Sequence, residues 1–434
     1  MKYTIKKIIF SIGLIGTLII TGCKKDYTNP NAATADQVFS SASGMTGVAV
    51  SLQRLYALTR AGSIYNIVTA NGFVTNELIL LNAGNTAEYQ LSVGGGTLDG
   101  TNTIIANIWS NANKIIYDAN NVIAAAANLS DKSYASGLIG YASLMKALAM
   151  GSMSMFWEKV PNGVGSNVSF IDRMQGYTNA IAIIDNALSI ISTNPVSTSF
   201  LANIPGGIDI VNSLQAVKAR FAIFSGNNVL ALTAANAVDL TKKSTFNFDA
   251  VSLNPIFETA TSTNNVFQPI DSTFGLPPSL APSVISPVDG RIAFYTSINS
   301  TIAPRFRVNG FGATASTAIP VYLPSEIILI KAEAYTRQND LPNGLNELNK
   351  VVTKTSSSDL FGIGANQTAL SGLSQTQLLD QIYRNRCIEL FMSGLKLEDM
   401  RRFGRPTSER KRNLFPYPFK ERDNNPNTPA DPAF

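Results

Sequence analysis

The spacing of apolar residues along the chain predicts a mainly α-helical protein. Apolar positions recur every three or four residues over Ala35–Arg60, Ile104–Leu129 and Lys132–Trp157, which is typical of helices with one buried face. A further amphipathic helix is expected over Tyr177–Ile191, because an Asn-Pro pair follows it and ends the helical pattern. These long periodic stretches form the framework of the predicted fold.

Two pairs of shorter helices are expected further along the chain. Ser213–Phe224 is followed by a Gly/Asn turn and by Val229–Leu240, and Glu326–Thr336 is followed by Asn343–Val352. Both pairs have the size of tetratricopeptide units but lack the full consensus, and an ordinary antiparallel hairpin is the alternative for each pair taken singly. Together with the earlier helices, they favour a repeat-like scaffold.

Two segments lack helical periodicity and are expected to form loops over this scaffold. Residues 61–103 contain Gly94-Gly95-Gly96, which is interpreted as a turn because no phosphate-binding Lys-Ser/Thr pair follows it. Residues 249–320 are rich in Pro, Ser, Asn and isolated aromatic residues, and so long an irregular stretch is typically functional. No sharp linker is found, so one domain is expected over residues 36–434, with a few short strands among its loops.

The first residues of the chain have the pattern of an exported lipoprotein. Three lysines precede Ile8–Ile20, an uncharged apolar run of 13 residues that suits a signal peptide but is too short to span a bilayer. The run leads into Thr21-Gly22-Cys23, and lipoprotein signal peptidase requires small residues before a Cys. We expect a signal peptide over residues 1–22, a lipid anchor on Cys23 and a polar tether over residues 23–35. An ordinary signal peptide followed by a chance Cys is the alternative.

Composition and charge narrow the classes of protein that fit. With 45% hydrophobic and 15% charged residues, the chain can build a large core and differs from disordered proteins. Loss of residues 1–22 removes three lysines and lowers the net charge from +5 to +2. Residues 384–422 hold 11 basic and 5 acidic residues. Salt-bridged helix faces explain this cluster better than nucleic-acid binding, because an exported lipoprotein rarely meets nucleic acid.

The chain shows no recognisable catalytic or metal-binding motif. It contains no histidine, which excludes His-dependent triads, general bases and zinc sites. Glu326 and Glu333, seven residues apart on one predicted helix, could position two carboxylates for acid–base chemistry, but capping and interhelical hydrogen bonds are favoured for them. No cofactor is expected, and a calcium site made of scattered Asp, Asn and carbonyl oxygens stays an open alternative. Cys387 is interpreted as a small buried residue, so no disulfide with an acylated Cys23 is expected.

A binding function would use aromatic side chains together with nearby amides and carboxylates. Sugar rings stack on aromatic faces while polar groups address their hydroxyls, and peptides use similar surfaces. Both irregular segments offer such residues, and packing inside the protein is the alternative for each aromatic one. The candidates in the first segment are Asn76, Glu77, Tyr89 and Asp99, with Glu88 beside them; those in the second are Phe274, Tyr295 and Phe311, with Phe267 and Phe306 beside them.

Several short motifs follow one another along the chain, and the longest runs from Arg384 to Gly404. It is similar to the signature ER-x-x-EL-x-x-EG-x-R-x-x-DL-x-R-x-G of the SusD/RagB family of surface lipoproteins. Glu326–Ala334 is similar to the family's E-x-x-L-x-x-AEA helix, and Phe156–Pro161 to its aromatic-WGDVP turn. Asp289–Arg291 resembles a D-x-R element, and Phe415–Asn424 resembles the closing PIP-x-x-E-x-x-x-N segment. With the N-terminal pattern, these motifs cover nearly the whole chain.

The resemblance implies structural roles for the charged residues of these motifs, which are expected to pin the C-terminal helices to the rest of the fold. Arg386 and Glu389, and likewise Asp399 and Arg402, are three residues apart and can meet on a helix. The structural set is Glu326, Glu333, Arg386, Glu389, Asp399 and Arg402. The sequence departs from the family pattern at single charged positions, where Asn385, Ser393 and Lys396 replace the usual Glu, Glu and Arg, and Glu158 replaces a Gly.

The resemblance also implies a function. Members of the family lie on the cell surface over a TonB-dependent β-barrel transporter (a SusC-like partner) and deliver a nutrient to it, usually an oligosaccharide and sometimes a peptide. Thr75-Asn76-Glu77 resembles the family's T-D-E element near the ligand face, which singles out Asn76 and Glu77. We therefore expect a lipid-anchored, outward-facing outer-membrane protein that binds an oligosaccharide and is not an enzyme. The alternatives are the same role for a peptide or another nutrient, a scaffold that binds only protein partners, and a hydrolase that uses Glu326 and Glu333.

Overall fold

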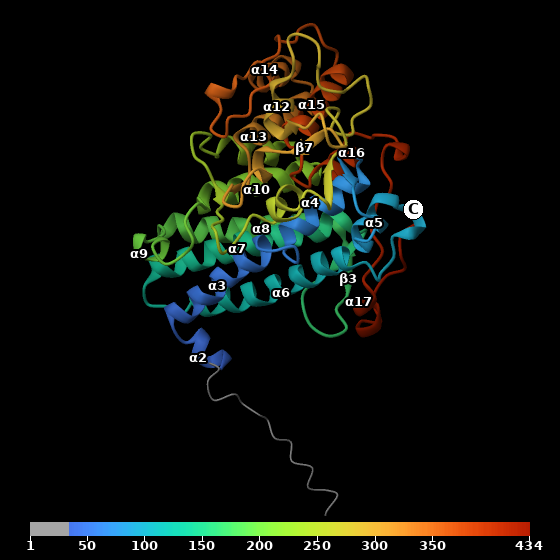
Figure 1. Cartoon of the computed structure of the whole chain (residues 1–434). Helices are drawn as coiled ribbons and strands as arrows, with labels where there is room; N and C mark the ends of the chain where they lie inside the picture. Colours follow the sequence, from blue (N-terminus) through green and yellow to red (C-terminus); the bar gives the residue numbers. More distant parts are fainter. Residues whose placement is uncertain (1–33) are drawn as a thin grey trace, which may run out of the picture.

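The computed structural model describes residues 34–434, and these residues form a mainly helical protein, as the sequence predicts (Figure 1). The predicted signal peptide and Cys23 lie outside the described residues, as does the tether up to residue 33. Within residues 34–434, no helix combines the length and the apolar character needed to cross a membrane.

Long antiparallel helices stack side by side to form most of the molecule. α6 (Thr103–Ala126) packs on α7 (Lys132–Phe156), α7 on α8 (Arg173–Thr193), and α8 on α10 (Ile210–Phe224). α3 (Ala42–Ala57) lies against α6 and α7, and Figure 1 shows the resulting layers. All four of the long predicted helices are thereby confirmed, although the first one is broken into α2 and α3.

The two predicted hairpins are also confirmed. α10 returns as α11 (Asn228–Asn236), and α13 (Pro324–Arg337) returns as α14 (Leu341–Val352). α11 packs on α13 as well, which joins the two pairs into one stack. Small residues allow the close approach: at Gly344 of α14, an added methyl group would overlap the Thr336 hydroxyl of α13.

Polar side chains fix where the long helices begin. The Asn102 side chain accepts a hydrogen bond from the Ile104 N–H at 3.0 Å and caps α6. Asp131, Asp172 and Asp209 cap α7, α8 and α10 in the same way. Each such cap contributes about 1 kcal/mol to helix stability. Most boundaries predicted for these helices therefore lie within a few residues of the observed ones.

The prediction of loops over residues 61–103 is wrong for much of this segment. α4 (Ser63–Val74) and α5 (Thr86–Val93) are helices, and the strand β1 (Leu78–Leu80) lies between them. Every residue of α4 is buried. A helix buried on all sides has no polar face, so its sequence shows no amphipathic period.

Residues 249–320 are largely irregular, as predicted. They hold a π-helical turn at Phe257–Ser262, the short helix α12 (Gly290–Tyr295) and several short strands. The antiparallel strand pairs are β1 with β5 (Phe267–Pro269), β2 (Lys159–Pro161) with β3 (Phe170–Asp172), β4 (Thr245–Phe246) with β8 (Ile319–Pro320), and β6 (Thr296–Ile298) with β7 (Phe306–Val308). The remaining α-helices are α2 (Ala35–Phe39), α9 (Thr198–Leu201), α15 (Gln375–Glu389), α16 (Lys396–Arg402) and α17 (Phe419–Asn424).

Charged residues of the C-terminal motifs tie helices together in the interior. Arg386 of α15 pairs with Asp399 of α16 at 2.9 Å, and Asp399 also pairs with Arg402 at 2.7 Å, as expected. Arg402 in turn reaches Glu333 of α13 at 2.7 Å. This network explains part of the basic cluster in residues 384–422 by ion pairing within the fold.

The expected pairing of Arg386 with Glu389 is wrong. Glu389 instead pairs with Arg291 at 3.2 Å and with Lys354 at 2.5 Å. The spacing of three residues permits a contact on the helix surface, but both side chains lie in the interior, where partners from other segments are nearer. Glu389 therefore connects α15 to α12, while Arg386 connects it to α16.

Candidate functional site

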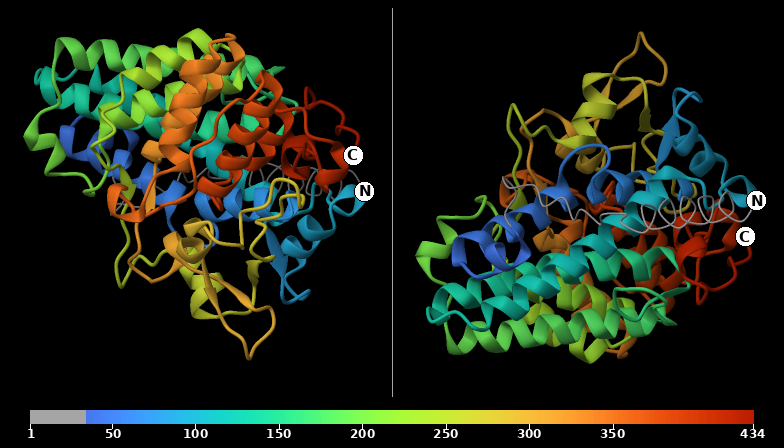
Figure 2. Two further views of the ribbon diagram at one scale, coloured as in Figure 1. Left: turned by 90° about the horizontal axis from the view of Figure 1, so that it is seen from above. Right: turned by 90° about the horizontal axis from the view of Figure 1, so that it is seen from below.

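Strand pairing brings the two predicted ligand-face segments together. The β1–β5 ladder continues on both sides, because the Leu81 N–H donates to the Val266 carbonyl and the Ile270 N–H donates to that of Glu77, each at 3.0 Å. Both views in Figure 2 show the blue segment with α5 beside the yellow loops of the second segment. Residues far apart in the sequence thus share one face of the molecule.

Glu77 lies beneath this face rather than on it. The residue is 1% exposed, and its carboxylate accepts a hydrogen bond from the Asn71 amide at 2.9 Å. Burial raises the pKa of the Glu77 carboxyl to about 7, and the nearby ammonium group of Lys396 opposes this rise. The same ammonium group donates to the Phe274 carbonyl at 2.7 Å. Glu77 therefore stabilises the packing beneath this face.

The aromatic candidates of the second segment form an interior cluster. Phe274 and Tyr295 are both buried, and their ring centroids are 6.1 Å apart. Phe391 completes the contact, with its centroid 4.3 Å from that of Phe274. Phe311 is half-buried and lies 6.2 Å from Tyr295. Packing, the alternative given for each aromatic residue, accounts for Phe274 and Tyr295.

The other three candidates lie nearer the surface and have separate local surroundings. The Asn76 backbone has a φ of 61°, and its side-chain amide donates to the Glu409 carbonyl at 3.0 Å. Asp99 accepts a hydrogen bond from the Thr101 N–H at 2.8 Å, which closes a surface turn. Tyr89 on α5 is 43% exposed, and Asp99 is exposed as well, whereas Asn76 is half-buried.

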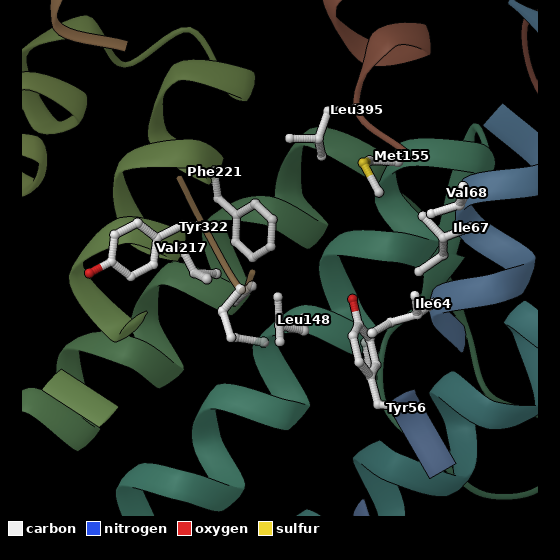
Figure 3. Close-up of a cluster of buried hydrophobic side chains, with 14 of the residues drawn as sticks. Tyr56, Ile64, Ile67, Val68, Leu148, Met155, Val217, Phe221, Tyr322 and Leu395 are labelled. Carbon is white, nitrogen blue, oxygen red and sulfur yellow. The ribbon is translucent and has the colours of Figure 1, made fainter. Parts of the chain in front are cut away.

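An apolar cavity of about 100 Å³ lies inside the protein. Its walls include Tyr56, Ile64, Leu148 and Tyr322, and Figure 3 shows the side chains of Tyr56, Ile64 and Leu148 close together. Small-molecule sites typically occupy about 300–1,000 Å³ and present several polar groups. The cavity is therefore too small to hold an oligosaccharide.

A larger, open pocket of about 450 Å³ lies where α4, α5 and α6 begin, and we refer to it as the α4–α6 pocket. Its polar lining comprises Arg60, Asn66, Asn85, Glu88, Thr103 and Asn107, with Tyr65 and Thr86. Of these residues, only Glu88 is among the binding candidates that the sequence offers. The others belong to three helix starts, where Asn and Thr are expected as caps. No pattern along the chain marks them as neighbours.

A second open pocket, of about 350 Å³, lies further along α6, and we refer to it as the Tyr117 pocket. Trp109, Asn113 and Tyr117 of α6 form one side, and Gly163 and Glu421 contribute to the other. The indole N–H of Trp109 donates to Glu421 at 2.9 Å. Tyr117 is 54% exposed. The surface along α6 therefore has two pockets, and different residues line each of them.

The two carboxylates of the hydrolase alternative are ion-paired in the interior. Glu326 binds Arg220 through contacts of 2.5 and 2.7 Å, and Glu333 binds Arg402 through contacts of 2.7 and 2.9 Å. Burial acts to raise the pKa of Glu333, but the charge and hydrogen bonds of Arg402 outweigh it and lower that pKa. Both carboxylates thus serve the interhelical bonding expected for them. Among residues 34–434, no three His, Cys, Asp or Glu side chains cluster closely enough to hold a metal ion.

Known proteins resemble this chain in structure, but no family model and no curated protein matches its sequence. Among solved structures, a SusD superfamily protein from Bacteroides vulgatus matches with a TM-score of 0.69 and 13% identity, covering 90% of this chain and 99% of that one. A SusD-like carbohydrate binding protein from the same organism matches with a TM-score of 0.65 and 16% identity, over 83% of each chain. A laminarin binding SusD-like protein matches with a TM-score of 0.63 and 14% identity, over 91% of this chain and 99% of that one. The chain therefore has the SusD-like fold.

Proposed function

We propose that the protein is a surface lipoprotein that binds an oligosaccharide and delivers it to a TonB-dependent outer-membrane transporter. The observation that carries this proposal is the match of about nine-tenths of the chain to SusD-like structures, one of which is a laminarin binding protein. The N-terminal pattern ending in Cys23 supports the lipid anchor and the outer-membrane location.

A binding role fits the chemistry better than a catalytic one. Hydrolysis of a glycosidic bond needs two carboxyl groups that face the substrate. Glu326 and Glu333 face arginines, and their side chains are at most 2% exposed. Amide, hydroxyl and aromatic groups are instead gathered in open pockets, where they could hold a ligand without changing it.

The lipid anchor is tested by metabolic labelling with palmitate in a bacterium that processes such lipoproteins. Wild-type protein should carry the label and sediment with outer membranes. Cys23→Ala should lose both properties, whereas Cys387→Ala serves as the matched control and should keep them. Equal labelling of wild type and Cys23→Ala would remove the anchor from the proposal.

The transport role is tested by isolating the tagged lipoprotein from outer membranes in detergent and identifying its partners by mass. A large β-barrel recovered in near-equal amount would support delivery to a transporter. If the protein is folded and surface-exposed but no barrel accompanies it, the transport role fails and a protein-interaction scaffold becomes the better account. A screen against oligosaccharides and peptides then separates the nutrient classes.

A further inference from the structure

The α4–α6 pocket is built by three helix starts that hold one another in place. α4, α5 and α6 contact each other pairwise, and Figure 1 shows them as neighbours. The Asn102 amide ties α5 to α6, because it donates to the Ala87 carbonyl at 2.9 Å and to Gln90 at 2.8 Å. The Asn111 amide donates to the Ala61 carbonyl at 2.8 Å and ties α6 to the start of α4. The pocket is therefore a preformed feature of the scaffold.

The charges in the pocket balance each other. The guanidinium group of Arg60 contacts the Glu88 carboxylate at 2.5 Å, and the Tyr65 hydroxyl donates to the same oxygen at 2.6 Å. Glu88 is 2% exposed and is held rigidly by these two partners. The remaining lining residues are uncharged. A pocket without net charge gives no preference to an anion or a cation, so it suits a neutral polar ligand.

Several polar groups of the lining have unused hydrogen-bonding capacity. Asn66 is fully buried, and its amide donates to the Gly62 carbonyl at 2.6 Å, but no donor among residues 34–434 reaches its Oδ1 atom. Buried polar atoms normally have a partner. The side chains of Asn107 and Thr103 also make no hydrogen bond within the described part of the chain, although both line the pocket. Amides and hydroxyls that both donate and accept match the hydroxyl groups of a sugar.

An exposed aromatic ring follows the lining residues of α5 in the chain. Tyr89 is 43% exposed and comes directly after Thr86, Ala87 and Glu88, which line the pocket together with the N-cap residue Asn85. Its ring is available for contact with the apolar C–H face of a sugar, while the amides of the pocket address the hydroxyls. The volume of about 450 Å³ is within the usual range of about 300–1,000 Å³ for small-molecule sites.

We propose that the α4–α6 pocket binds a sugar unit of a neutral oligosaccharide, with Asn66 and Asn107 as hydrogen-bonding partners and Tyr89 as the stacking ring. This inference rests on the proposed function and deepens it, because it assigns the site and the ligand class. Asn107 supplies an amide that has no hydrogen bond within residues 34–434, Asn66 supplies a buried acceptor without a donor, and the Arg60–Glu88 pair supplies a rigid polar wall.

The experiment measures binding of laminarin-derived and starch-derived oligosaccharides to the purified protein by isothermal titration calorimetry. Asn107→Ala and Tyr89→Ala remove groups that make no hydrogen bond to the described residues, so the fold should be retained. Each should weaken binding of the oligosaccharide that the wild type recognises by roughly 3–10-fold, the effect of one lost hydrogen bond or ring contact. Asn121→Ala is the matched control, because it changes the same residue type on the same helix about 21 Å away. It should bind like the wild type.

The outcomes separate this inference from the proposed function. If the wild type binds a glycan and both pocket variants bind it equally well, the pocket assignment is wrong while the binding function stands. If Tyr117→Ala alone weakens binding, the Tyr117 pocket is the site instead. If folded wild-type protein binds no glycan of either series and binds peptides, the oligosaccharide function fails and the pocket assignment fails with it. Thermal unfolding followed by circular dichroism checks that each variant is folded.

Discussion

Glu77 is a carboxyl group whose charge the fold disfavours. Its pKa rises from an ordinary 4.5 to about 7 because the group is buried, although Lys396 opposes the rise. At a pH between these two pKa values, Glu77 holds a proton in the folded protein but has released it in the unfolded chain. The free energy of unfolding therefore decreases as the pH rises through this window. With about 1.4 kcal/mol for each pKa unit, the loss is about 3 kcal/mol.

The Glu77→Gln variant tests this expectation, because an amide stays neutral at every pH and can still accept the Asn71 hydrogen bond. Denaturant unfolding at pH 4.5 and pH 8 should show a drop in stability for the wild type that is about 3 kcal/mol larger than the drop for Glu77→Gln. Other titrating groups are common to both proteins and cancel in this comparison. Identical pH profiles would mean that the Glu77 carboxyl is not held in a desolvated site.

Single residues also show why the candidate site was only partly predictable. The sequence favours Glu77, Phe274 and Tyr295 as candidates because a carboxylate and aromatic rings in segments without helical periodicity are typical of binding surfaces. Whether such a group faces solvent depends on which residues pack over it. Here these are Lys396 and Phe391, which follow Phe274 by more than a hundred residues. A single sequence does not encode that proximity as a pattern.

At the scale of helices, glycine allows α7 and α10 to approach each other closely. A methyl group added at Gly151 of α7 would overlap the ring of Phe221 on α10. Gly151→Ala should therefore destabilise the protein by roughly 1–3 kcal/mol, because the ring or a helix must move. Gly47→Ala on α3 is the matched control, because an added methyl group there meets nothing within 4 Å. It should stabilise the protein by up to about 1 kcal/mol, the helix-propensity gain.

Thermal or denaturant unfolding of the two alanine variants gives the comparison directly. The two changes are chemically identical and both lie within helices, so opposite signs would isolate the contact with Phe221. If Gly151→Ala were as stable as Gly47→Ala, the close packing of α7 on α10 would be refuted.

The Arg220–Glu326 pair links α10 to α13, and its role is structural. Both side chains are less than a tenth exposed. Glu326→Ala should cost about 3–5 kcal/mol, because it leaves the Arg220 guanidinium buried without its partner. The double variant Arg220→Met/Glu326→Leu should recover most of this loss, since a pair of apolar residues needs no charge partner. Denaturant unfolding of the single and double variants measures both effects. A stable Glu326→Ala protein that has lost a hydrolytic activity of the wild type would instead favour the enzyme alternative.

The helices themselves differ in how well the sequence predicts them. α6 and α7 each have a long periodic pattern and a polar cap, and both were predicted to within a few residues. α4 was missed because all of its residues are buried, so hydrophobic and small polar residues alternate without a period. The sequence does not reveal the α4–α6 pocket either, because its lining residues come from three separate helix starts.

At the scale of the whole molecule, the end of the chain closes over the helical stack. The Phe415 N–H donates to the Phe156 carbonyl at 2.8 Å, and the Trp157 indole donates to the Pro416 carbonyl at 2.9 Å. The rings of Phe156 and Phe415 stack with centroids 4.8 Å apart. Phe156, Trp157 and Phe415 belong to the same hydrophobic cluster as Met45 of α3. The last segment is therefore part of the main core.

Both tryptophans of the chain lie at this closure, so their fluorescence reports on it. Trp109 and Trp157 have ring centroids 4.8 Å apart, and Phe415 lies 6.2 Å from Trp157. Phe415→Ala should destabilise the protein by about 3–5 kcal/mol, as expected for loss of a fully buried ring. Because the closure shares the main core, tryptophan fluorescence and far-ultraviolet circular dichroism should change together during denaturant unfolding, at a lower midpoint than in the wild type. If fluorescence instead changes first while the helical signal persists, the C-terminal segment unfolds as a separate unit and is not part of the main core.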